Sequence, residues 1–314
     1  MMDIEATRKT LFGAATVALV AMLALPPLTG FSVDIVSFLP TFVLAAVLAA
    51  FLPYARWRKL DAMVPALESM ALGMALTAPV IVLTYVAMRL NFPLADGLLI
   101  RMDEALGLDW PAFIDLIDRS PFVADALFYF YMAFGPQLIL LPALLCAVGL
   151  PLRAYQVTLG WLIIGVTASI VTTAFPSVAA YAGHGITARD LDHINIWLGT
   201  GFLESFVAVR EQAHFTLGIS NASGIVSFPS IHAGAAVLCA WAAWPSRLLR
   251  YPILALNILM GLAAIPYGAH YFVDIIAGIL VALVAIAAMK KIAATSFQSP
   301  IARRALRPAI DPAG

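Results

Sequence analysis

The sequence predicts an all-α protein, a polytopic bundle of helices integral to a membrane. Of its 314 residues, 62% are hydrophobic and only 11% are charged, and the mean hydropathy is +0.95. Soluble domains carry about 25% charged residues, so the composition argues against a soluble protein. A helix needs about 20 apolar residues to cross a bilayer, and roughly eight runs approach that length. The predicted spans are residues 11–29, 34–53, 64–88, 122–149, 154–175, 229–245, 252–268 and 270–289.

Basic residues mark where these runs begin and end. The first run follows Arg8 and Lys9 and is longer than the apolar core of a cleaved signal peptide, so we interpret it as an anchor helix. The basic segment 56–59 separates the second run from the third, and Arg153 lies between the fourth and the fifth. Both connections are therefore expected on the cytoplasmic side. The last two runs are short and almost contiguous, which predicts a crowded hairpin.

The distribution of basic residues predicts the topology. With a cytoplasmic N-terminus and alternating sides, thirteen of the 18 Lys and Arg residues fall on the inner side. Such an excess is typical of cytoplasmic loops. We therefore expect a multi-pass protein of the cell (inner) membrane with both termini in the cytoplasm. The five outer basic residues are Arg89, Arg101, Arg119, Arg189 and Arg210.

Two long segments are expected on the outer side. Residues 90–121 include the stretch 102–111, which predicts a short interfacial helix with Trp110 at the level of the lipid headgroups. Residues 175–227 mix aromatic and charged side chains. Because loops of this length are usually functional or disordered, we interpret this mixture as a folded cap lying on the membrane.

The first motif that carries chemistry is F-P-S-I-H-A-G, residues 228–234. A proline is tolerated in the first turn of a helix, so Pro229 predicts the start of the sixth span. The unpaired N–H groups of such a turn favour anions. Ser230 adds a hydroxyl donor, and His232 lies in the same turn. The alternative is a helix cap with an interfacial histidine.

The second motif is H-Y-F-V-D, residues 270–274. His270 and Asp274 are four residues apart and share one face of a helix. A carboxylate bonded to one ring nitrogen fixes the tautomer and leaves the other nitrogen free to attack. The alternative is a histidine paired with an acid inside a bundle. Both motifs begin spans on the outer side, and ionisable groups at membrane depth indicate function, so we predict one extracytoplasmic site.

The two motifs resemble those of a known family. The segments G-I-V-S-F-P-S-I-H-A (224–233) and G-A-H-Y-F-V-D (268–274) look like the P-S-x-H and H-x-x-x-D motifs of the type 2 phosphatidic acid phosphatase (PAP2) superfamily. They are more similar to the branch of aureobasidin-sensitive inositol phosphorylceramide synthases and bacterial relatives. The resemblance covers residues 205–280 and implies a PAP2-like core in the C-terminal half.

The resemblance also implies a division of the chain and a set of roles. We expect N-terminal helices and an outer segment in residues 1–120, a catalytic membrane domain in 121–292 and a cytoplasmic basic tail in 293–314. His270 would attack phosphorus and form a phosphohistidine, and Asp274 would orient it. His232 would protonate the leaving group and then act as a base for the acceptor. Ser230 would hold a phosphate oxygen, and no cofactor or metal is implied.

Two departures from the family pattern concern the phosphate clamp. The first motif, K-x-x-x-x-x-x-R-P, is missing, and Ala263 and Ala264 stand where the third motif usually opens with S-R. Phosphoryl transfer still needs cations to offset developing charge. We predict Arg210 as the substitute, followed by Arg189 and Arg101. The alternative for each is an ordinary surface arginine.

The predicted function is phosphoryl transfer on a lipid phosphate or phosphodiester. Water as acceptor gives a lipid phosphatase, whereas inositol or another polyol gives a phosphotransferase; no nucleic-acid partner is expected. The alternative class is a transporter or lipid-binding protein with a degenerate site. Transport predicts charged residues along a path through the bilayer. Glu68, in the third span, is the only clear mid-bundle charge in the sequence, which argues against transport. A metal site of His232, His270 and Asp274 is a further alternative, but the helix start beside Ser230 favours an anion.

Overall fold

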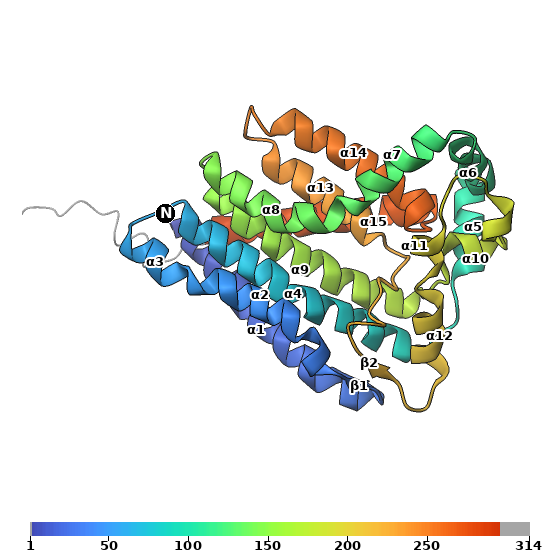
Figure 1. Cartoon of the computed structure of the whole chain (residues 1–314), viewed down its shortest axis with the longest axis horizontal. Coiled ribbons are helices and arrows are strands. Elements are labelled where there is room, and N and C mark those ends of the chain that lie inside the picture. The colour runs from blue at the N-terminus through green and yellow to red at the C-terminus, as the bar shows by residue number, and fades with distance from the viewer. Residues whose placement is uncertain (1, 296–314) are drawn as a thin grey trace, which may run out of the picture.

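The computed structural model describes residues 2–295. The predicted basic tail, residues 293–314, lies outside this part of the chain except for its first three residues. Figure 1 shows long helices running side by side, with a group of short helices at one end. We call this group the cap and define it as residues 95–120 and 176–227.

The described part of the chain is mainly helical and contains almost no strand, as predicted. The helices of the bundle are α1 (Met2–Thr29), α2 (Leu39–Ala50), α3 (Leu52–Trp57), α4 (Met63–Arg89), α7 (Pro121–Met132), α8 (Phe134–Ala147), α9 (Pro151–Ala174), α13 (Ile231–Ala243), α14 (Arg250–Tyr267) and α15 (Phe272–Thr295). The cap contains α5 (Asp96–Ala105), α6 (Trp110–Asp118), α10 (Ala179–His184), η2 (Ala188–Asp190), α11 (Trp197–Thr200) and α12 (Leu203–Glu211). A 3-10 helix, η1 (Ile35–Phe38), precedes α2. Two short parallel strands, β1 (Ser32–Val33) before η1 and β2 (Thr216–Leu217) in the cap, pair with each other.

Several of these helices are long and apolar enough to cross a membrane. Within residues 2–295 there are six, or seven when α7 and α8 count as one bent span. The chain is therefore a multi-pass membrane protein, but the predicted number of eight is not confirmed. Helix α13 has 13 residues and is only about 20 Å long at 1.5 Å per residue. That is shorter than the roughly 30 Å hydrocarbon core of a bilayer.

The predicted fourth span is broken in the middle. Helices α7 and α8 meet at Ala133 with a bend of 53°. Pro136 in the first turn of α8 has no N–H to donate to the carbonyl of Met132, and its ring would clash with that carbonyl in a straight helix. Tyr131 and Phe134 lie on either side of the bend, and both pack against the ring of His232.

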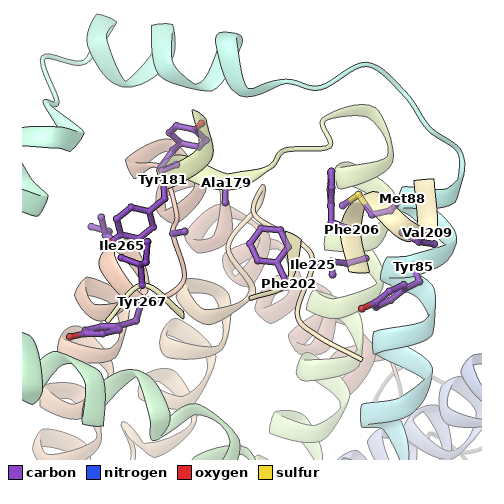
Figure 2. Packing of buried hydrophobic residues seen from close by; sticks show 14 of the residues in the cluster. Tyr85, Met88, Ala179, Tyr181, Phe202, Phe206, Val209, Ile225, Ile265 and Tyr267 are labelled. Carbon is purple, nitrogen blue, oxygen red and sulfur yellow. The ribbon is translucent and has the colours of Figure 1, made fainter. Parts of the chain in front are cut away.

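A buried aromatic and aliphatic cluster joins the cap to the ends of the bundle helices (Figure 2). The cap contributes Tyr181 of α10, Phe202 at the start of α12 and Phe206 within α12. These side chains pack with Tyr85 of α4 and Tyr267 of α14. Burying an aromatic side chain of this size contributes about 1.5–3 kcal/mol. The cap is thus held to the bundle by its own core rather than by surface contacts.

The first half of the cap differs from the prediction in two ways. The expected helix 102–111 is interrupted, because Gly107 adopts φ +72° after α5 and Asp109 caps α6 by accepting a hydrogen bond from the N–H of Ala112. Trp110 is only 1% exposed, so its indole packs inside the protein and is not presented to lipid headgroups as predicted. Leu108, two residues earlier on the turn, is only half-buried.

Asp118 anchors the second half of the cap to the first. Its carboxylate accepts hydrogen bonds from the backbone N–H groups of Asp192, Ile194 and His193, at 2.7–2.8 Å. Burial on its own raises the pKa of Asp118, but these three donors outweigh it and hold the pKa below its ordinary value. The charged carboxylate is therefore part of the fold of the cap.

Glu68, expected in the middle of the bundle, lies near the start of α4 at the end opposite the cap, where its carboxylate is fully paired. Its carboxylate accepts hydrogen bonds from Arg8 at 2.6 and 2.8 Å, from Arg56 at 2.8 Å and from the hydroxyl of Tyr155 at 2.7 Å. The group joins α1, α3, α4 and α9. Two arginines and a tyrosine hold this carboxylate in place, so the four residues form a structural cluster.

Candidate active site

The two motifs meet where α13 crosses α15. The N–H of Ser230 donates to the carbonyl of Asp274 at 2.9 Å. Gly278, one turn further along α15, permits this approach, because a Cβ there would lie 2.2 Å from the carbonyl oxygen of Ser230. Helix α13 begins at Ile231 with Ser230 as its N-cap, so the prediction that Pro229 forms the first turn was wrong. The extended backbone of Ser230 lets its Oγ accept from the N–H of Ala233, which shifts the helix start past the proline.

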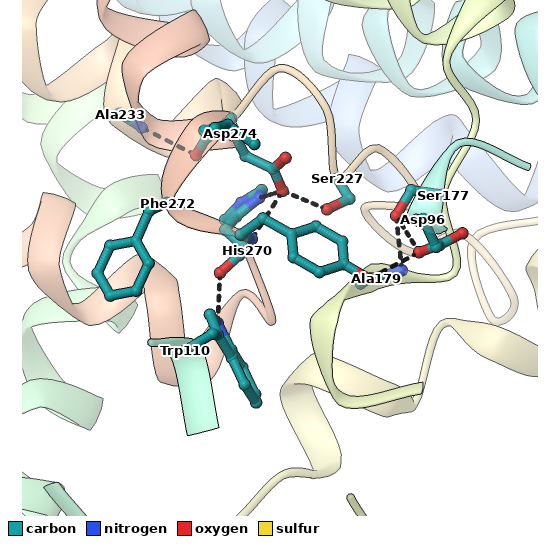
Figure 3. Close-up of polar contacts among 12 residues, drawn as sticks. Asp96, Trp110, Ser177, Ala179, Ser227, Ala233, His270, Phe272 and Asp274 are labelled. Atoms are coloured by element: carbon teal, nitrogen blue, oxygen red, sulfur yellow. Dashed lines mark hydrogen bonds and ion pairs between the residues drawn. The ribbon is translucent and has the colours of Figure 1, made fainter. Parts of the chain in front are cut away.

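His270 and Asp274 lie side by side (Figure 3). His270 precedes α15, which begins at Phe272, so the prediction that the two residues share one face of a helix was wrong. Nδ1 of His270 is 3.2 Å from Oδ2 of Asp274. The same oxygen accepts hydrogen bonds from Ser227 Oγ at 2.5 Å and from the N–H of Tyr271 at 3.0 Å. Asp274 is 0% exposed and His270 is 3% exposed. This arrangement fixes the carboxylate and leaves Nε2 as the ring nitrogen that Asp274 does not occupy.

His232 faces this pair from the first turn of α13. Its ring centroid is 6.1 Å from that of His270. On its other sides it stacks against Tyr131 at 4.4 Å and packs against Phe134 at 4.2 Å. The bend between α7 and α8 thus supplies the aromatic walls that orient the second imidazole.

Both imidazoles line one cavity of about 410 Å³. Among the described residues that line it, none is Lys, Arg, Asp or Glu. Its polar side chains are Thr77, Thr84, Ser223, Tyr131, Trp161 and Trp197 besides the two histidines, and the rest of the lining is Val80, Ile81, Phe134, Leu198, Gly201, Phe202, Gly224, Ile225, Val226, Ile231 and Gly268.

A glycine keeps the free nitrogen of His270 open to this cavity. A Cβ at Gly268 would lie 2.7 Å from Cδ2 and 3.0 Å from Nε2 of His270. Contacts of that length occur very rarely, so any larger residue would push the ring or cover its nitrogen. The cavity therefore contains one imidazole with a free nitrogen and a second imidazole beside it.

The two predicted phosphate-binding residues, Ser230 and Arg210, lie in different surroundings. Ser230 is 1% exposed, and its Oγ caps α13 two residues before His232. Arg210 on α12 donates from Nη2 to the carbonyl of Phe92 at 2.9 Å, and its guanidinium carbon lies 5.2 Å from the centre of the Phe206 ring. Neither residue is part of the cavity lining. Their phosphate-binding roles stay predictions.

Three residues that contact the site were not identified from the sequence. Ser227 directly precedes the first motif, and its position three residues before Ser230 was the available signal. Asp103 and Trp110 come from the cap, more than 150 residues away. Trp110 Nε1 donates to the carbonyl of His270 at 2.9 Å, and the carboxylate of Asp103 accepts from backbone N–H groups that follow His270. No local pattern announces either contact.

The arrangement suits transfer of an anionic group through nitrogen. One imidazole has a carboxylate on Nδ1 and a free Nε2, which is the geometry of an activated nucleophile. The second imidazole is close enough to exchange a proton with a group bound between them. Most of the lining is apolar, and low polarity strengthens electrostatic interactions inside the cavity.

Comparison with known protein families gives one match. Residues 97–288, more than half of the chain, match the model of the PAP2 superfamily. The matched region begins in α5 and includes both motifs. Comparisons with curated proteins and with solved structures gave no match. The chain therefore belongs to the PAP2 superfamily.

Proposed function

We propose that this protein transfers the phosphoryl group of a lipid phosphate or phosphodiester through a phosphohistidine on His270. Membership of the PAP2 superfamily indicates a membrane phosphatase or phosphotransferase. The proposal adds the route and the residues. The observation that carries it is the pair of imidazoles in one cavity, with Asp274 bonded to Nδ1 of His270 and Nε2 left free.

In the first half-reaction, Nε2 of His270 attacks phosphorus and the bond from phosphorus to the leaving oxygen breaks. His232, in its protonated form, donates a proton to that oxygen. Asp274 stabilises the positive charge that develops on the imidazole of His270, because its carboxylate is already oriented by Ser227 and by the N–H of Tyr271.

In the second half-reaction, the phosphorus–nitrogen bond of the phosphohistidine breaks. His232, now neutral, accepts a proton from the acceptor as its oxygen attacks phosphorus, which restores both histidines. Water as acceptor releases phosphate. The hydroxyl group of inositol or another polyol gives a new phosphodiester or phosphomonoester, and the branch resemblance favours such a transfer.

Two residues are proposed to bind the phosphate. The N-terminus of α13 offers partial positive charge beside His232, and Ser230 would add its hydroxyl hydrogen, since its oxygen already accepts from Ala233. Arg210 would supply the cation that the family's missing basic motif otherwise provides. In the free protein its guanidinium is bonded to the carbonyl of Phe92, so this role requires α12 or its side chain to shift toward the cavity.

The site is proposed to face the extracytoplasmic side of the cell membrane, with both termini in the cytoplasm. The excess of basic residues at the end opposite the cap supports this orientation. A membrane-impermeant thiol reagent added to intact cells should label an Ala188→Cys variant in the cap and spare a Leu248→Cys variant in the α13–α14 connection. The reverse pattern would place the site in the cytoplasm.

An activity assay on purified protein tests the proposed chemistry. The protein in detergent is incubated with a labelled lipid phosphate or a labelled phosphoinositide, each with and without added inositol. Free phosphate, diacylglycerol-type products and new inositol phosphates are separated and counted. His270→Ala is compared with the wild type and with His214→Ala, a control on a histidine outside the cavity.

We expect turnover by the wild type and by His214→Ala, and loss of about a thousandfold or more in His270→Ala. A thousandfold corresponds to roughly 4 kcal/mol of transition-state stabilisation. The proposal fails if His270→Ala, folded and at equal concentration, keeps activity within about tenfold of the wild type. It also fails if no lipid phosphate or phosphodiester is consumed by the wild type.

A further inference from the structure

We propose that Asp103 and Trp110, two residues of the cap, are positioning residues for the nucleophile. They hold the backbone on either side of the His270 side chain and so set the place of its ring in the cavity. This inference rests on the proposed function of His270. It assigns a role in the reaction to α5 and α6, which contain neither sequence motif.

Trp110 fixes the carbonyl of His270. Its indole N–H donates to that oxygen at 2.9 Å, and both groups are buried (Figure 3). The indole itself is held in place, because it packs edge-on against Tyr181 at 5.0 Å and stacks on His184 at 5.1 Å. With 1% of its surface exposed, the indole has little freedom to follow a displaced partner. The carbonyl of His270 is thus tied to a rigid group.

Asp103 fixes the two residues that follow the motif's tyrosine. Its Oδ2 accepts from the N–H of Phe272 and its Oδ1 from the N–H of Val273, both at 2.9 Å. These are the first two N–H groups of α15, which have no partner within the helix. Asp103 is 2% exposed, and burial raises the pKa of its carboxyl group. It acts as a helix cap supplied from a different element.

The segment that these residues hold is strained. Ala269 has φ +52°, a left-handed conformation that costs a residue with a Cβ about 1–2 kcal/mol. The carbonyl of Ala269 accepts from the N–H of Ala180 at 2.8 Å, another contact from the cap. A strained residue persists only when its surroundings over-determine it. Three successive contacts from the cap, to residues 269, 270 and 272–273, meet that requirement.

The ring of His270 depends on this support. Its hydrogen bond to Asp274 is long, at 3.2 Å, and Asp274 lies in the first turn of α15, directly after the segment that contains His270. If the segment relaxes, the imidazole and its carboxylate move together relative to His232 on α13. A shift of about 1 Å at a reacting group lowers a rate by up to about a hundredfold. Loss of either cap contact should therefore reduce catalysis more than substrate binding.

The test compares Trp110→Phe, which removes the N–H and keeps an aromatic ring, with Asp103→Asn, which replaces one acceptor oxygen by an NH₂ group facing a backbone N–H. Glu104→Gln is the matched control, because Glu104 neighbours Asp103 on α5 and is exposed. For each variant of the full-length protein in detergent we would measure kcat, KM for one lipid phosphate, inhibition by vanadate and the thermal unfolding temperature. Vanadate mimics the five-coordinate phosphoryl group, and transition-state analogues report on alignment.

We expect kcat to fall about tenfold to a hundredfold in Trp110→Phe and Asp103→Asn, with vanadate affinity falling in parallel. KM should change less than threefold, and Glu104→Gln should match the wild type. If one of the two variants fails to fold, the other decides. The inference is overturned if a folded variant keeps kcat and vanadate affinity within threefold of the wild type, or if only its thermal stability falls.

His270→Ala separates this result from failure of the proposed function. An inactive His270→Ala with fully active Trp110→Phe and Asp103→Asn rejects the positioning role alone. An active His270→Ala rejects the phosphohistidine itself and, with it, any role for the cap in placing that residue.

Discussion

Replacing Gly278 by alanine tests whether the crossing of α13 and α15 sets the distance between the two histidines. A Cβ at this position would lie 2.2 Å from the carbonyl oxygen of Ser230 and 3.1 Å from the Cβ of Ala233. Ordinary contacts begin at 3.4 Å, so the helices must separate by about 1.2 Å. Neither neighbour can rotate away, because one is backbone and the other is a methyl group on a helix.

The magnitudes predict that activity suffers more than stability. Overpacking of this kind costs about 1–3 kcal/mol, and the gain in helix propensity from glycine to alanine returns up to about 1 kcal/mol. We therefore expect the free energy of unfolding to fall by about 0–2 kcal/mol. A displacement of about 1 Å between His232 and His270 can lower kcat/KM by about a hundredfold, which corresponds to about 2.7 kcal/mol.

The assay measures kcat/KM and thermal unfolding of Gly278→Ala beside those of Gly73→Ala. Gly73 lies within α4, and a Cβ there meets nothing within 4 Å. The control should keep full activity and equal or slightly higher stability. If Gly278→Ala kept kcat/KM within about threefold of the wild type, the close crossing would not be what aligns the two imidazoles.

Three further predictions follow from single contacts. Ser227→Ala removes the 2.5 Å hydrogen bond to the carboxylate of Asp274; since bonds to charged groups contribute about 1.5–3 kcal/mol, kcat should fall about tenfold to a hundredfold, and an unchanged kcat would show that the bond does not matter for catalysis. Arg210→Lys should lose more catalytic efficiency on a lipid phosphate than Arg189→Lys, because a guanidinium binds phosphate through two nitrogens; equal thermal stability with lower activity would support phosphate binding, whereas a fall in both would indicate a structural role. Asp118→Asn should lower the free energy of unfolding at pH 7 by about 1–3 kcal/mol. Because the folded pKa of Asp118 is depressed, its stabilisation is present above about pH 4 and is lost as the pH falls through the folded value, so the difference from the wild type should shrink at pH 3; a difference that stays constant would contradict this.

The helical fold and the two histidine motifs could be identified from the sequence because each depends on a local pattern. A run of apolar residues indicates a span, and the spacing of His270 and Asp274 indicates a contact between them. The contact is present, but His270 precedes α15, so the two residues do not share one face of a helix as predicted. The same local reasoning predicted one helix over residues 102–111, yet Gly107 and Asp109 divide that stretch into two. Apolar length also suggested a sixth span, whereas the Ser230 cap shortens α13 to 13 residues.

The support of the site could not be predicted, because it depends on contacts between distant elements. Tryptophan is common at membrane interfaces, so the sequence favoured an interfacial anchor at Trp110. Only the fold shows that its indole is buried against the carbonyl of His270. The walls of the cavity come from α4, from the bend between α7 and α8, and from α11, none of which contains a recognisable motif. Arg210 was chosen because phosphate binding needs a positive charge, and this chemical need does not determine where the side chain lies in the fold.

Isolation of the phosphorylated intermediate is the most direct test of the central claim. The purified protein would be mixed with a lipid carrying labelled phosphate, quenched in alkali within milliseconds to seconds, digested and mapped by mass spectrometry. We expect label on His270 that is stable in alkali, lost in acid and absent in His270→Ala. In His232→Ala the label should accumulate, because the second half-reaction lacks its base. Turnover of the lipid with no labelled protein at any time, or with label on another residue, would contradict the proposal.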